Sequence, residues 1–70
     1  MNNREIGKSI KINRLSQGMS QQQLAKLIGT THAAISYWEN GVNIPNVNDC
    51  WSIADVLKIS IDYTHLIHKP

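Results

Sequence analysis

The segment over residues 20–41 constrains the fold most, because it contains two short helical patterns separated by a break of a few residues. Within each pattern, apolar residues recur three or four positions apart, which places them on one face of a helix. These positions are Leu24, Leu27 and Ile28 in the first pattern and Ile35 and Trp38 in the second. We therefore predict two amphipathic helices, over residues 21–28 and 32–40, that bury these faces in one small core.

A polar residue precedes each of these helices, and a glycine lies between them. Ser20 and Thr31 each stand where a side-chain oxygen can accept from unpaired backbone N–H groups at a helix start. Gly29 stands where the chain must turn, since glycine reaches left-handed backbone angles at no steric cost. Two short helices joined by a tight, glycine-containing turn form a helix-turn-helix, whose second helix can enter the major groove of DNA.

The chain before this motif predicts one more helix, over residues 3–16. Ile6 and Ile10 lie on one of its faces, and Gly18 ends it. A loop follows the motif over residues 42–46, pinned by a proline.

The chain after this loop predicts a fourth helix, over residues 47–57, which Asn46 or Asn48 can cap. Its apolar positions are Val47, Cys50, Trp51, Ile53, Ala54 and Leu57. A fifth, short helix is expected over residues 61–67, capped by Ser60. No segment alternates with a period of two, and no hairpin turn signal is present. The expected fold is therefore all-α, with five helices in a single domain over residues 1–70.

Size and composition narrow the class of protein. Seventy residues allow one small core, and no apolar run is long enough to cross a membrane. The N-terminus lacks the charged and then apolar pattern of a secretory signal, and the single Cys50 excludes an internal disulfide framework. We expect a cytoplasmic protein in which Cys50 is a small buried residue.

Net charge alone does not point to nucleic acid. Seven Lys and Arg residues stand against five Asp and Glu residues, which gives a formal charge of +2. The distribution is uneven, because four cations gather near the N-terminus while three aspartates lie in the second half. The cations are Arg4, Lys8, Lys11 and Arg14, and the aspartates are Asp49, Asp55 and Asp62.

Many positions together resemble the Cro/C1-type (XRE) helix-turn-helix family, which includes the lambdoid phage repressors and Cro proteins. The matching residues cover about positions 4–66 and are Ile6, Gly7, Lys8, Ile10, Arg14, Gly18, Met19, Ser20, Gln21, Leu24, Ala25, Gly29, Ile35, Ser36, Trp38, Glu39, Asn40, Gly41, Pro45, Ile53, Ala54, Leu57, Ile61 and Asp62. The resemblance implies a compact five-helix, lambda-repressor-like domain that binds operator DNA as a symmetric dimer.

The resemblance also implies roles for individual residues. The helix over residues 32–40 would be the recognition helix. Its base-facing positions would be His32, Ala33, Ser36 and Tyr37, and the backbone-contacting positions would be Gln21, Thr31 and Asn40. Arg14 and Glu39 match two positions that form a largely buried ion pair in the family. The loop over residues 42–46 departs from the pattern, because it has no Lys or Arg where relatives often carry basic residues.

We therefore predict a sequence-specific DNA-binding transcriptional regulator, a repressor of phage or bacterial origin, that forms a homodimer on double-stranded operator DNA. The alternative is a protein-interaction module on the same fold, antitoxin-like or antirepressor-like, with weak DNA binding. An enzyme is not expected, since the sequence has no phosphate-binding glycine loop and no nucleophile–base constellation. No cofactor and no membrane partner are expected.

The positions of several apolar side chains have more than one interpretation, and one histidine pair has the spacing of metal ligands. Ile12 and Leu15 lie off the Ile6 and Ile10 face. They are scattered surface residues or pack on the fifth helix, or else they form a partner or dimer patch. Trp38 is expected in the core, with a half-exposed place beside the helix over residues 47–57 as the alternative. Trp51 is either at the core edge or a dimer anchor. His65 and His68 have the spacing of two metal ligands, but a third ligand is missing, so no metal site is predicted.

Overall fold

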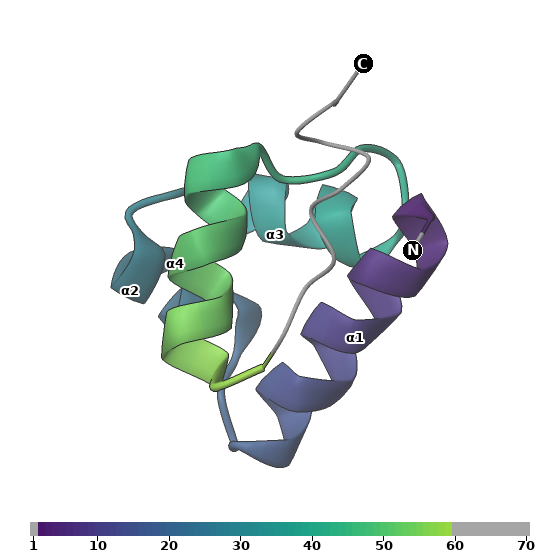
Figure 1. Ribbon diagram of the computed structural model, residues 1–70. Helices are drawn as coiled ribbons and strands as arrows, with labels where there is room; N and C mark the ends of the chain where they lie inside the picture. The colour runs from purple at the N-terminus through teal and green to yellow at the C-terminus, as the bar shows by residue number, and fades with distance from the viewer. Residues whose placement is uncertain (1, 60–70) are drawn as a thin grey trace.

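Polar N-caps begin each of the four helices in the computed structural model, which describes residues 2–59 (Figure 1). The helices are α1 (Asn3–Ser16), α2 (Gln21–Ile28), α3 (His32–Glu39) and α4 (Val47–Leu57). Across residues 2–59 there is no strand, so the all-α prediction is confirmed. The fifth helix expected over residues 61–67 lies outside the described residues.

The caps explain why the helices begin where the sequence predicts. The Ser20 hydroxyl accepts from the Gln23 N–H at 3.0 Å while the Gln23 side chain accepts from the Ser20 N–H at 2.7 Å, which completes a capping box. The Thr31 hydroxyl accepts from the Ala34 N–H at 3.1 Å. Of the two candidate caps for α4, Asn46 fills the role by accepting from the Asp49 N–H.

The helix ends also follow the sequence closely. Gly29 closes α2 with φ of 74°, the left-handed conformation predicted for this turn. α3 ends one residue earlier than predicted, because Asn40 leaves helical geometry and becomes the C-cap. α4 ends at Leu57, and its C-cap Lys58 is a non-glycine residue at φ of 57°.

Apolar side chains from all four helices meet in one core. Its fully or nearly fully buried members are Ile6, Ile10, Leu24, Ala25, Ile35, Trp38, Cys50, Ile53 and Leu57. The core placement of Trp38 and Cys50 is confirmed. Leu27 was expected in this core and is instead 60% exposed. The buried stripe of α2 runs along Leu24, Ala25 and Ile28, and Leu27 lies about 160° around the helix from Ala25.

α1 approaches α3 closely, because residue 7 has no side chain. A Cβ atom at Gly7 would overlap the backbone carbonyl oxygen of Trp38 and crowd that of Glu39. The first half of α1 therefore lies directly against the C-terminal end of α3 (Figure 1). At the other end of α1, the Gln17 side chain donates to the Leu57 carbonyl at 2.7 Å and ties α1 to the end of α4.

Three large apolar side chains remain on the outside of α1 and α4. Trp51 is 62% exposed, so of its two interpretations the core edge is not supported. The adjacent Cys50 takes the inward direction, which turns Trp51 about 100° away. Ile12 and Leu15 are also exposed, and their expected packing on the fifth helix lies outside the described residues. None of the described helices is long and apolar enough to cross a membrane.

Candidate nucleic-acid interface

α3 presents one exposed face and buries the opposite one. Ile35, Trp38 and Glu39 point inward, whereas Ala33, Tyr37 and Asn40 are exposed. Positions 33, 37 and 40 are four and three residues apart, so their side chains share one face of the helix. His32 is exposed at the start of α3, and Ser36 is half-buried beside Asn40, whose side-chain amide lies 3.4 Å from the Ser36 hydroxyl. This face of α3 therefore carries no Lys, Arg, Asp or Glu side chain.

An ion pair between α1 and α3 fixes the orientation of this face. The Arg14 Nε donates to Glu39 Oε2 at 2.6 Å and its second terminal nitrogen donates to Oε1 at 3.0 Å, which makes a bidentate pair. The remaining guanidinium nitrogen donates to the Met19 carbonyl at 2.7 Å. The two side chains are only 7% and 1% exposed. A charge pair this buried is tolerable because its polar atoms are hydrogen-bonded.

Gln21 extends this pair to the start of α3. Its Nε2 donates to Glu39 Oε1 at 2.9 Å, and its Oε1 lies 2.7 Å from His32 Nε2. The resemblance implies a phosphate contact for Gln21, whereas in this structure its side chain connects α2 to both ends of α3. This connection was not predicted. Its only signal in the sequence is a long amide side chain, Gln21, at the start of α2, downstream of Arg14, the arginine expected to be buried.

The hydrogen bonds of Gln21 fix the protonation of one ring nitrogen of His32. A carboxylate only accepts, so Gln21 must turn its NH₂ group toward Glu39 and its carbonyl oxygen toward His32. The His32 Nε2 must therefore carry a proton and donate it. This bond fixes the ring at the N-terminal end of the exposed face, with Nδ1 as its second polar atom.

The first turns of α2 and α3 contain no acidic residue. Unpaired N–H groups and the positive end of the helix dipole at such positions favour an anion. Thr31 is exposed beside the first of these N–H groups of α3 and caps that helix. These two helix starts are compatible with the phosphate contacts expected for Gln21 and Thr31.

The seven residues proposed for DNA contact are not all brought into one cluster. Gln21 and His32 are linked to each other and to the buried ion pair, and Ser36 and Asn40 are neighbours. Thr31 is exposed as the N-cap of α3, where it accepts from the Ala34 N–H, and Ala33 and Tyr37 are exposed along that helix. Between residues 2 and 59, no group of three His, Cys, Asp or Glu side chains could hold a metal ion, and His65 and His68 lie outside that range.

The sequence pattern of the helix-turn-helix family matches residues 10–64. An uncharacterised HTH-type transcriptional regulator of Rickettsia conorii is 41% identical over 58 residues, which are 83% of this chain and 46% of that protein. A similar regulator of Rickettsia prowazekii is 40% identical over 58 residues, which are 83% of this chain and 45% of that protein. This chain therefore spans less than half the length of these relatives.

A phage repressor resembles the chain in both sequence and structure. The repressor protein C2 of Salmonella phage P22 is 32% identical over 63 residues, which are 90% of this chain and 29% of that protein. A crystal structure of the P22 c2 repressor in complex with a synthetic operator superposes with a TM-score of 0.78 and 31% identity. The superposition covers 83% of this chain and 88% of that chain. These relatives are transcriptional regulators and a repressor rather than enzymes.

Proposed function

This chain belongs to the Cro/C1-type (XRE) helix-turn-helix family, and we propose that it is a sequence-specific DNA-binding transcriptional regulator that acts as a repressor. The observation that carries the proposal is the close structural likeness to a phage repressor bound to operator DNA. In our proposal, α3 lies in the major groove and the starts of α2 and α3 lie against the DNA backbone.

In this proposal, the residues of α3 and of the two helix starts have different tasks. His32, Ser36 and Tyr37 carry polar groups that can bond base edges, and the Ala33 methyl can pack on a thymine methyl. Thr31, Asn40 and the backbone N–H groups at the start of α2, where Gln21 stands, contact phosphates, which positions the protein without reading sequence. Two copies of the chain would read two half-sites about one helical turn of DNA apart.

Selection from a library of random-sequence duplexes tests this proposal. The wild-type protein should enrich one site with two-fold symmetry, because a symmetric dimer reads the same half-site twice. Tyr37→Ala should lower the preference for the enriched site over a random duplex, because one of the side chains that discriminate bases is gone. Lys58→Gln, which changes a side chain at the far end of α4, is the control and should enrich the same site.

The competing function is a protein-interaction module of antitoxin-like or antirepressor-like type. Exposed Trp51, Ile12 and Leu15 are the residues that favour it. The two functions differ in salt dependence, because DNA binding releases counterions and weakens steeply as salt rises, whereas an apolar protein contact does not. A folded wild-type protein that enriches no duplex at low salt would contradict the regulator proposal and favour this alternative.

A further inference from the structure

α3 and the loop over residues 42–46, which follows α3, contain no Lys or Arg. His32 is the only basic residue of α3. Phosphate neutralisation by Lys and Arg supplies most non-specific affinity of DNA-binding proteins. Any strong ionic contact near the C-terminal end of α3 must therefore come from another element.

α1 carries a row of cations beside this end of α3. Arg4, Lys8 and Lys11 are four and three residues apart, so they occupy one exposed face of α1. The close approach at Gly7 brings this part of α1 against the last turn of α3. Gly41 leaves room for Arg4, because a Cβ atom there would lie 3.2 Å from the Arg4 Cγ.

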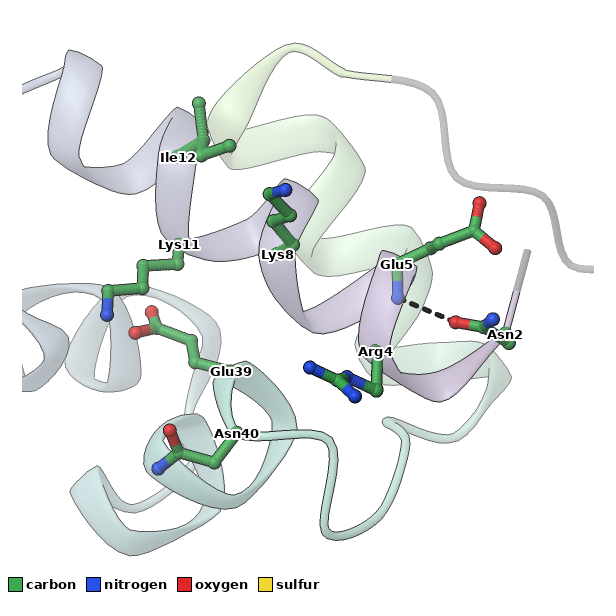
Figure 2. A pocket seen from close by; sticks show the side chains of 8 residues that line it. All are labelled: Asn2, Arg4, Glu5, Lys8, Lys11, Ile12, Glu39 and Asn40. Atoms are coloured by element: carbon green, nitrogen blue, oxygen red, sulfur yellow. Dashed lines mark hydrogen bonds between the residues drawn. The ribbon is translucent and has the colours of Figure 1, made fainter.

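The cations line a hollow between α1 and the end of α3. This hollow of about 670 Å³ is lined by Asn2, Arg4, Glu5, Lys8, Lys11, Ile12, Glu39 and Asn40. In Figure 2 the Arg4 guanidinium and the Lys11 side chain extend from α1 toward the side of Glu39 and Asn40, while Lys8 points another way. Asn40 also ends the exposed face of α3, so the hollow continues the proposed DNA-binding face.

The two carboxylates at the hollow do not cancel this charge. Glu39 is already occupied by the bidentate bond from Arg14 and the bond from Gln21. The Glu5 carboxylate points away from Arg4 in Figure 2. Among residues 2–59, no carboxylate oxygen lies within 4.0 Å of the charged nitrogens of Arg4, Lys8 or Lys11. Within this described part of the chain, Arg4, Lys8 and Lys11 are therefore in no ion pair and outnumber the one unpaired carboxylate, Glu5, at the hollow.

We propose that Arg4, Lys11 and Asn40 form a binding site for a backbone phosphate of the duplex that α3 reads. Arg4 would offer two N–H groups in a fork, Lys11 a point charge, and the Asn40 amide a further donor. α1 then supplies the ionic contact that the neutral α3–α4 loop lacks. This inference rests on the proposed DNA-binding function.

The alternative role for these cations is structural, since positive side chains near the C-terminal end of α3 also interact favourably with the helix dipole. Measurements of DNA binding distinguish the two roles. A dipole contact changes stability alone, whereas a phosphate contact changes the number of counterions released on binding.

Affinity for one enriched duplex and one random duplex, measured between about 50 and 200 mM salt, tests the site. Arg4→Gln and Lys11→Gln should each lower the slope of log affinity against log salt by about 1, and should weaken both duplexes equally. Lys58→Gln also removes one positive charge, but at the C-terminal end of α4, which lies beside the C-terminal end of α1. This control should leave the slope unchanged. Lys11 is exposed, so its variant remains informative if Arg4→Gln disturbs packing on Gly41.

The outcomes separate the two proposals. If wild-type protein binds the enriched duplex and all three variants share its slope, the phosphate site is wrong while the regulator function stands. If folded wild-type protein binds no duplex, the regulator function fails and this site fails with it.

Discussion

Helices α1 and α4 both close the domain around the helix-turn-helix pair, but they do so through different physics. α1 meets α3 through a backbone approach at Gly7 and a buried, bidentate ion pair between Arg14 and Glu39. α4 contributes apolar side chains, chiefly Ile53 and Leu57, to the common core. The first kind of contact tolerates almost no change in geometry, whereas apolar packing tolerates small changes in volume. The orientation of α3 therefore depends on α1.

The largest effect is expected where α1 and α3 touch. Gly7→Ala should lower the free energy of unfolding by about 3 kcal/mol or more, because the new methyl overlaps backbone atoms that cannot move aside. Gly29→Ala is the matched control, since it strains a left-handed turn but meets nothing within 4 Å, and should cost about 1–2 kcal/mol. Urea unfolding measures both. Equal losses in the two variants would contradict the close approach.

The ion pair should give the next largest effect. Arg14→Met should lower the free energy of unfolding by about 3 kcal/mol, because Glu39 keeps its charge in a site that is nearly closed to water. The double variant Arg14→Met with Glu39→Leu should recover part of this loss, since no unpaired charge remains. Lys11→Met removes an exposed cation from the same helix and is the control. A melting curve for Arg14→Met like that of wild type would reject the buried pair.

The α4 half carries a pH-dependent effect. Burial, with a smaller contribution from the Asp49 charge, raises the pKa of the Cys50 thiol from 9.0 to about 11. As pH rises from 9 to 11 the unfolded chain loses this proton first, so the free energy of unfolding should fall across that window. Urea unfolding of wild type and Cys50→Ala at pH 8 and pH 10.5 measures the difference. An equal pH dependence in both proteins would contradict the raised pKa.

The smallest effect is expected for apolar packing within α4. Ile53 is fully buried, and Ile53→Val should lower the free energy of unfolding by about 1 kcal/mol, because one methyl group leaves the core. Thermal and urea unfolding measure the change. A loss of unfolding free energy as large as that of Arg14→Met would mean that the α4 contacts tolerate no more change than those of α1. That result would contradict the difference between the two helices.

Local signals in the sequence predicted the helices well. Ser20, Thr31 and Asn46 act through backbone groups within three residues, so their roles can be seen without knowing the fold. Leu27 was misplaced, and the place of Trp51 stayed open, because the direction of the core relative to a short helix depends on its neighbours.

The interface was harder to predict than the helices. The exposure of Ala33 and Tyr37 follows from the period of α3. The bonds from Gln21 to Glu39 and His32 depend on residues 18 and 11 positions away, and local pattern does not specify such pairs. The role of Gly7 also depends on residues far away in the sequence. From the sequence alone, Gly7 is only an unfavourable residue within a helix.

Backbone amide chemical shifts during titration with the enriched duplex test the central claim most directly, namely that α1 and α3 together form the DNA-binding face. The largest changes should occur along α3 at Ala33, Tyr37 and Asn40 and on α1 near Arg4 and Lys11. Changes centred on α4 around Trp51, with α3 unaffected, would contradict the account and move the binding surface to the opposite half of the domain.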